Sequence, residues 1–289
     1  MKTSRLFFGR GRGNIKGDMP TKPRLGQNFL NDTQAVERIA NSLGDLAGRT
    51  VLEIGPGAGA ITGALAARAA HVLAVELDPA LAAHLRTQFD QAKVTILNQD
   101  VLHFDFAAAS AAAGHALCVV GNLPYYITSQ ILLKLAASHA VPCRAILDRA
   151  ILMVQREVAD RVTAKPGSRD YGLLSVTVQL YGPAEQLFTL PPSAFSPPPD
   201  VHSTVFRWRF APRFAELGLD ETSFTPFVRK VFAQKRKTLA NNLRAAQFSP
   251  EIIVTALAQA GIDSHARAEA LPVESLAALW RSLQAQAAK

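Results

Sequence analysis

Short apolar runs of five or six residues alternate along residues 50–137 with segments in which apolar residues recur every three or four positions. Runs of the first kind are typical of buried strands, and segments of the second kind are typical of amphipathic helices. Strands separated by helices of this length predict an α/β fold built on a parallel, doubly wound sheet. The expected strands are 50–54, 71–76, 94–97 and 116–120, and the expected helices are 60–69, 79–89 and one that includes 131–135.

The pattern is less decisive between residues 144 and 210. Residues 175–181 alternate like a strand, but their apolar positions also suit a buried helix, so both structures stay open. The proline-rich residues 191–200 predict a stiff surface loop whose only aromatic residue is Phe195. The remaining expectations are a fifth strand within 144–155, a helix at 156–161 and two further strands at 184–190 and 203–210.

No strand pattern follows residue 210, and helices are expected at 221–232, 238–246, 251–260 and 273–284. The change of pattern predicts a domain boundary. We therefore expect a flexible basic arm (1–20), an α/β domain (21–210) and a small all-helical C-terminal domain (211–289).

Composition restricts the class of protein. The chain has 289 residues, of which 48% are hydrophobic and 19% are charged, as in globular proteins. No apolar run approaches the roughly 20 residues that a membrane span needs. The first residues carry too short an apolar core for a secretory signal. We therefore expect a cytoplasmic protein that does not bind membranes.

The formal net charge of +8 is concentrated in two segments. Residues 1–24 and residues 225–245 each carry a net charge of +6, so the rest of the chain is acidic. Two basic patches predict contact with nucleic acid, although a solvated tail and a solvated helix face are the alternative. The basic residues of the second segment are Arg229, Lys230, Lys235, Arg236, Lys237 and Arg244.

A glycine-rich turn, Gly55-Pro56-Gly57-Ala58-Gly59, joins the first expected strand to its helix. Gly55, Gly57 and Gly59 would let the backbone approach a nucleotide at the helix N-terminus. Glu76 ends the next strand, 21 residues after Gly55, where a carboxylate can bind both ribose hydroxyls. A nicotinamide dehydrogenase would share these features, but Glu53 before the glycines favours S-adenosylmethionine. Asp100, after the third strand, is either an acceptor for an adenine amine or a helix cap.

The fourth strand runs into Asn122-Leu123-Pro124-Tyr125. An exocyclic adenine amine is a poor nucleophile, because its lone pair is delocalised into the ring. The Asn122 side-chain oxygen and the Leu123 carbonyl can each accept one of its N–H groups. Pro124 keeps Leu123 extended, and Tyr125 offers a face on which a base can stack. The tetrapeptide therefore predicts methyl transfer to an adenine amine.

With these motifs the chain resembles the bacterial small-subunit rRNA adenine N6,N6-dimethyltransferases, the kasugamycin-sensitivity proteins. The resemblance runs from Pro23 to the last helix. It rests on the segments Leu25–Leu30, Glu53–Gly59, Glu76–Asp78, Asn98–Asp100, Asn122–Tyr125, Val154–Ala159, Phe195–Pro199 and Lys235–Leu239.

The resemblance implies a Rossmann-like, S-adenosylmethionine-dependent methyltransferase sheet with a helical C-terminal RNA-binding domain. In such a protein Asn28 and Leu30 would frame the methionine end of the cofactor, together with Gly55 and Asn122. Glu76 would hold the ribose and Asp100 the adenine. Residues 122–125 would hold the target base, and Phe195 would close its other face.

The implied reaction is two methylations on each of two adjacent adenines in the 3′-terminal hairpin loop of small-subunit rRNA. S-adenosylhomocysteine would be the product, no metal would take part, and a monomer would act on a nearly assembled small ribosomal subunit. Two rivals remain: an assembly factor that acts mainly by binding, and a large-subunit rRNA adenine methylase.

Overall fold

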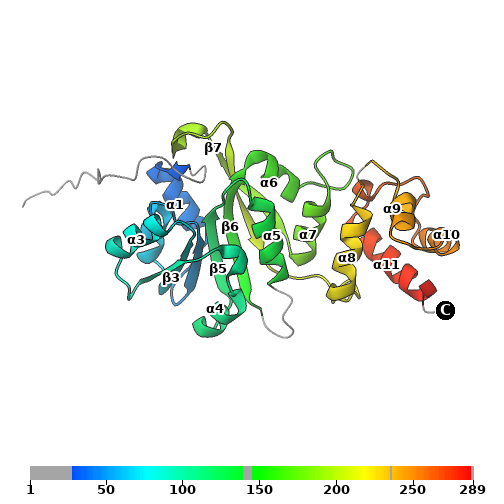
Figure 1. Cartoon of the computed structure of the whole chain (residues 1–289), viewed down its shortest axis with the longest axis horizontal. Coiled ribbons are helices and arrows are strands. Elements are labelled where there is room, and N and C mark those ends of the chain that lie inside the picture. Colours follow the sequence, from blue (N-terminus) through cyan, green and yellow to red (C-terminus); the bar gives the residue numbers. More distant parts are fainter. Residues whose placement is uncertain (1–27, 139–144, 235, 288–289) are drawn as a thin grey trace, which may run out of the picture.

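The computed structural model describes residues 28–138, 145–234 and 236–287. Its centre is a seven-stranded sheet in the order β4-β3-β2-β5-β6-β9-β7, with helices on both faces (Figure 1). The seven strands expected from the sequence are confirmed, with ends that differ by a few residues. They are β2 (Thr50–Ile54), β3 (His71–Glu76), β4 (Val94–Asn98), β5 (Leu117–Asn122), β6 (Leu147–Gln155), β7 (Ala184–Leu190) and β9 (Ser203–Arg209).

The first four strands, which helices separate, pair in parallel as expected, but the sheet as a whole is mixed. Strands β4, β3, β2, β5 and β6 are parallel, but β9 is antiparallel to both β6 and β7. No α-helix lies in the connection from β7 to β9. Parallel neighbours need a crossover connection, so strands joined in this way pair antiparallel.

Different helices cover the two faces of the sheet, because successive side chains of a strand point to opposite sides. In β5, Leu117 and Val119 belong to one hydrophobic core, and Cys118 and Val120 belong to the other. Helices α1 (Thr33–Ser42), α2 (Ala60–Ala66) and α3 (Pro79–Gln88) complete the second core. The first core is completed by α4 (Phe106–Ala113), α5 (Thr128–Ala137), α6 (Arg156–Val162) and α7 (Leu173–Tyr181).

Residues 173–181 form helix α7, which decides the choice that periodicity left open. The buried Ser175 hydroxyl fixes the first turn, because it accepts the Gly172 N–H at 3.1 Å and donates to the Arg161 carbonyl. The helix is apolar on most sides because it lies between the sheet and the C-terminal helices. It contacts α5 and α6 on one side, and α8 (Glu221–Val231) and α11 (Val273–Ala287) on the other.

A second, two-stranded sheet joins β1 (Phe29–Leu30) to β8 (Phe195–Ser196). Leu30 pairs with Phe195, and the Asn31 N–H donates to the Ala194 carbonyl at 2.9 Å. The sequence did not predict this pair. The expectation of a surface loop at 191–200 is wrong for Phe195, which is 3% exposed. The pair connects the first described residues to a segment more than 160 residues later.

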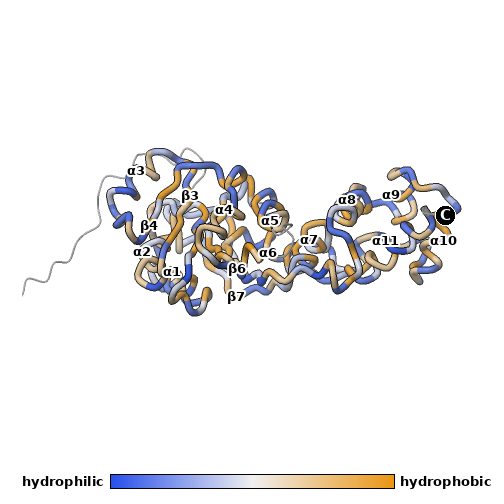
Figure 2. Tube along the Cα trace, turned by 90° about the horizontal axis from the view of Figure 1, so that it is seen from below, coloured by the Kyte–Doolittle hydropathy of each residue, from blue (hydrophilic) through white to orange (hydrophobic). Residues whose placement is uncertain are grey.

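The expected C-terminal helices are α8, α9 (Leu239–Ala245), α10 (Pro250–Gln259) and α11. They lie at one end of the elongated molecule in both views, and Figure 2 also shows apolar colours along the strands. No strand follows Arg209 in the described residues. One hydrophobic core extends from the sheet into these helices, so the domain boundary at residue 210 stays a prediction. None of the described helices is long and apolar enough to cross a lipid bilayer.

Candidate active site

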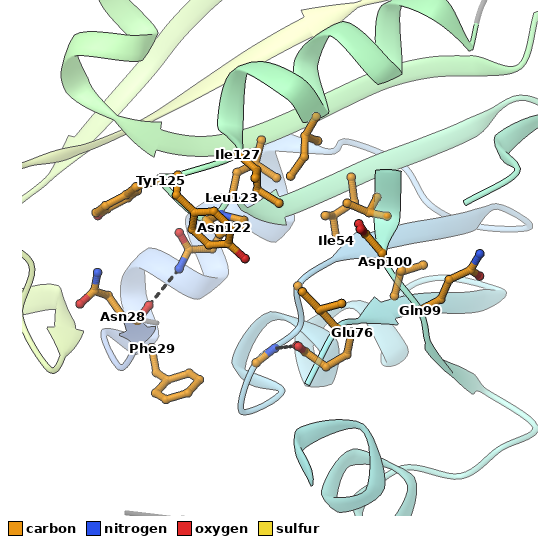
Figure 3. Close-up of a pocket in the computed structure, with 18 residues that line it drawn as sticks. Asn28, Phe29, Ile54, Glu76, Gln99, Asp100, Asn122, Leu123, Tyr125 and Ile127 are labelled. Atoms are coloured by element: carbon orange, nitrogen blue, oxygen red, sulfur yellow. Dashed lines mark hydrogen bonds between the residues drawn. The ribbon is translucent and has the colours of Figure 1, made fainter. Parts of the chain in front are cut away.

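A cavity opens where β2, β3 and β5 end and the segment after β4 begins (Figure 3). Ligands of such α/β sheets bind at the carboxyl ends of the strands. Nine of the residues selected from the sequence line this cavity. They are Asn28, Gly55, Gly57, Glu76, Asp100, Asn122, Leu123, Pro124 and Tyr125.

The glycine turn passes beside the cavity, and its glycines have different tasks. Gly57 lines the cavity, and a Cβ there would lie 3.0 Å from the Phe29 ring. A Cβ on Gly59 would lie 2.9 Å from Leu85, so the packing of α3 requires this glycine. Gly59 lines neither this cavity nor the smaller adjoining one, which Leu30 lines.

Glu76 is a buried carboxylate that backbone donors hold in one orientation. Its Oε2 accepts the Gly57 N–H at 3.0 Å, and its Oε1 accepts the Asp78 N–H at 2.9 Å. Burial raises the pKa of Glu76 above its ordinary value, and these two hydrogen bonds oppose the rise. Each carboxylate oxygen keeps a further lone pair. The group can therefore accept two hydroxyl groups of a ligand in the cavity.

Glu53 lies behind the glycine turn and lines the adjoining cavity. It is 1% exposed and accepts the Thr62 hydroxyl at 2.6 Å. Burial raises its pKa to about 7, the Thr62 bond opposes the rise, and the charge of Glu76 adds to it. Two carboxyl groups near the glycine turn make this region favourable for a ligand that carries positive charge.

Asp100 is a helix cap, which is one of the two roles that the sequence left open, and it also lines the cavity. Its Oδ1 accepts the Leu102 N–H at 2.9 Å and so caps the short 3₁₀ helix Val101–His103. Its Oδ2 lies 3.5 Å from Nδ1 of the exposed His103. Because Asp100 also lines the cavity, one carboxylate oxygen serves the cap while lone pairs of the other stay available to a ligand.

The Asn122 amide has a fixed orientation. Its Nδ2 donates to the Asn28 carbonyl at 3.0 Å, a bond drawn in Figure 3. A carbonyl accepts hydrogen bonds only, so the NH₂ group must face Asn28 and the Oδ1 must face away from it. The next residue is fixed as well, because the Leu123 N–H donates to the Met153 carbonyl at 2.9 Å. The end of β5 therefore presents an acceptor in a defined place.

Tyr125 and the turn around it are held from two sides. The Tyr125 hydroxyl lies 3.1 Å from the hydroxyl of the buried Ser203 on β9. The Pro124 carbonyl accepts the Thr128 hydroxyl at 2.9 Å and the Ile127 N–H at 3.3 Å. The half-buried Tyr125 ring therefore has a defined position at the cavity.

Comparison with known proteins places this geometry in a family. A family model described as ribosomal RNA adenine dimethylase matches residues 19–285. The chain belongs to this family. A relative from Acidobacterium capsulatum, named ribosomal RNA small subunit methyltransferase A, is 56% identical over 264 residues, which are 91% of each chain. A relative of the same name from Koribacter versatilis is 46% identical and covers 91% of this chain and 94% of its own.

Two solved structures resemble this rRNA adenine dimethylase over most of its length. The 23S rRNA methyltransferase ErmE matches with a TM-score of 0.65 at 26% identity, over 89% of this chain and all of its own. A dimethyladenosine transferase from Plasmodium falciparum matches with a TM-score of 0.72 over 90% of this chain and 98% of its own. Since the second is only 19% identical, it shows the fold alone. The expected Rossmann-like methyltransferase sheet with C-terminal helices is thus confirmed.

The structure does not bring Phe195 of this dimethylase into the cavity. Phe195 belongs to the core on the α1–α3 side of the sheet, where it pairs with Leu30. A ring that is 3% exposed has no free face for a base. In this conformation Phe195 therefore packs against β1 and, contrary to what the resemblance implies, does not close the other face of the target base.

The basic residues of the second patch lie around the ends of α8 and α9. Lys230 and Ala246 line one shallow cavity, so these two helix ends are close together. All described members of the patch are exposed, which fits a nucleic-acid surface. They are Arg229, Lys230, Arg236, Lys237 and Arg244; Lys235 and the arm at residues 1–20 lie outside the described residues.

Four residues of the site were not selected from the sequence. Asn98 fixes the end of β3, because its Nδ2 donates to the carbonyls of Glu76 and Leu77 at 2.9 and 3.0 Å. Ser203 anchors Tyr125. Phe29 and Tyr126 line the cavity. Phe29 and Asn98 stand inside quoted motifs, so their position was a signal, whereas Ser203 gave none.

Proposed function

We propose that this rRNA adenine dimethylase transfers methyl groups from S-adenosylmethionine to the N6 amines of two adjacent adenines. These adenines lie in the 3′-terminal hairpin loop of small-subunit rRNA. The observation that carries the proposal is the fixed Asn122 amide, which lines the same cavity as Glu76. The names of the two most similar relatives described above support the small subunit as the substrate.

The cavity fits S-adenosylmethionine by the chemistry of its lining. Glu76 would accept the two ribose hydroxyls, and Asp100 would accept the adenine amine of the cofactor. The acidic surroundings of Glu53 and Glu76 suit a ligand with a positive charge. The cofactor supplies a methyl group that its sulfonium has already activated, so the protein needs mainly to align the acceptor.

Asn122 and Leu123 would prepare the target amine. The Asn122 Oδ1 and the Leu123 carbonyl each accept one N–H, and no described residue donates to either of them. An amine whose two hydrogens are held in this way has its lone pair directed out of the plane of the ring. After one methylation a single N–H remains, and one of the two acceptors is enough to hold it.

Tyr125 would bind the target base by stacking, a contact worth about 1–3 kcal/mol per base. The ring is ready for this task, because Ser203 holds its hydroxyl and the turn at Pro124 holds its backbone. The target adenine must leave its stack to reach the ring, so open or loop RNA is the expected substrate. The exposed basic residues at α8 and α9 would bind the phosphates around this loop.

The direct test is methyl transfer from labelled S-adenosylmethionine to small ribosomal subunits that lack the modification, followed by nucleoside analysis. We expect label in N6,N6-dimethyladenosine at two adjacent positions. Absence of label in the small subunits, together with label when large subunits are the substrate, would favour the large-subunit methylase and refute the proposal.

A second candidate function, an assembly factor that acts by binding, draws on the basic patches alone. Glu76→Ala separates the two, because it removes the ribose acceptor and leaves the basic surface intact. We expect S-adenosylhomocysteine binding and methyl transfer to be lost while subunit binding persists. Glu37→Ala, a change of an exposed glutamate on α1, is the matched control. If cells that carry Glu76→Ala grow like wild-type cells, although growth requires subunit binding, the assembly role is favoured.

A further inference from the structure

Tyr126 is the only exposed aromatic side chain in the described part of the chain. It is 57% exposed and lines the same cavity as Asn122 and Tyr125. Single exposed apolar residues are common on protein surfaces and alone mean nothing. The position of Tyr126 is different, because the ring stands where a nucleic acid must enter if the proposed function is correct.

The backbone of Tyr126 is held on both sides, although its ring is exposed. Tyr125 before it is anchored to Ser203, and Ile127 after it donates its N–H to the Pro124 carbonyl. The buried Thr128 then begins helix α5. The Tyr126 hydroxyl makes no hydrogen bond to a described residue. The ring is thus presented to solvent by a firm turn and has no visible task in the fold.

We propose that Tyr126 stacks on the nucleotide next to the target adenine and so contributes to binding of the RNA loop at the site. This inference rests on the proposed function. When one adenine stacks on Tyr125 inside the cavity, the RNA chain must leave through the cavity mouth. The neighbouring base has lost its own stacking partner at that point. An aromatic ring one residue along the same turn offers a replacement, and every base can stack on it.

The same contact would serve both target adenines. Because they are adjacent, each is the neighbour of the other, and whichever is methylated second leaves its methylated partner near the mouth. A methylated base still has its aromatic face, so Tyr126 can bind it. Recognition by stacking therefore tolerates the product of the first reaction, whereas hydrogen bonds to the amine would not.

The test compares Tyr126→Ala and Tyr126→Phe with the wild-type full-length protein on unmodified small subunits. Tyr126→Ala should raise the KM for subunits by about 5- to 150-fold, the loss of one stacked base, with little change in kcat. Tyr126→Phe keeps the ring and should stay within about twofold of wild type. S-adenosylhomocysteine affinity and thermal stability should be unchanged in both, which separates stacking from a structural role. Val254→Ala, an exposed apolar position on α10, is the control.

A second arm tests the partner base itself. In the subunits of this arm the neighbouring adenine is replaced by uracil, which has a smaller ring. The ratio of the KM of Tyr126→Ala to the KM of wild type should be smaller on these subunits than on unchanged ones. The inference is overturned if Tyr126→Ala leaves the KM within twofold of wild type, or if Tyr126→Phe is as impaired as Tyr126→Ala. If the wild-type protein transfers no methyl group to small subunits, the proposed function itself has failed.

Discussion

Glu53→Gln should make the protein more stable at alkaline pH, which is unusual for a change beside a cofactor site. The Glu53 carboxyl is 1% exposed, and burial raises its pKa from 4.5 to about 7. A raised pKa means that the folded protein disfavours the charged form. The stability contributed by Glu53 is therefore complete below pH 4.5 and is lost as the pH rises through about 7. At about 1.36 kcal/mol per pKa unit, the loss is ~3 kcal/mol.

Glutamine has the same shape, cannot ionise and can still accept the Thr62 hydroxyl. The variant should not lose stability through ionisation at this position. The difference in free energy of unfolding between variant and wild type should therefore rise by ~2–3 kcal/mol from pH 5 to pH 8. Urea denaturation at both pH values measures it. A constant cost of burying the amide NH₂ cancels in the difference between the two pH values. Parallel pH profiles for wild type and variant would refute the reasoning, because Glu53 would then titrate with an ordinary pKa.

Three other changes test the site. Asn122→Asp places a carboxylate oxygen against the Asn28 carbonyl, so we expect kcat to fall about 100-fold or more. Calorimetry should still show S-adenosylhomocysteine binding. Equal losses of kcat and of this binding would contradict the assigned role. Tyr125→Phe removes the bond to Ser203 and should lower stability by about 1 kcal/mol in urea denaturation, with the KM for subunits nearly unchanged because the ring remains. A large rise in that KM would mean that the hydroxyl binds RNA. Raising salt from 50 to 200 mM should weaken subunit binding roughly a hundredfold if about five basic contacts release counterions, and a flat profile would exclude the basic patch.

The sequence predicted the elements whose local pattern matches their burial. Runs such as 117–120 are apolar at every position because both faces of β5 are covered. Helix α4 was missed, because its sequence of mainly alanine has no amphipathic pattern and only Phe106 and Ser110 are buried. Its end signals were present all the same. Asp105 caps the first turn by accepting the Ala108 N–H, and Gly114 ends the helix with a φ of 75°.

The site was predictable where each residue follows its own strand, as for Glu76 and Asn122. What fixes these residues could not be predicted, because the partners are remote in the sequence. The Asn122 amide is oriented by a carbonyl 94 residues earlier, and Tyr125 is anchored 78 residues later. Phe195 shows the same limit, because a proline-rich neighbourhood predicts exposure, whereas the pairing with Leu30 and the core on the α1–α3 side are remote in the sequence.

The bond that orients Asn122 has a genetic consequence. The acceptor on residue 28 is the main-chain carbonyl, so every amino acid at that position can supply it. Drift at codon 28 is therefore harmless to the amide, whatever it does to other contacts. A one-residue insertion or deletion within β1 would shift the carbonyl of residue 28 relative to β8 and Asn122 and break the bond. For this bond, the number of residues in β1 matters and the identity of the side chain at position 28 does not.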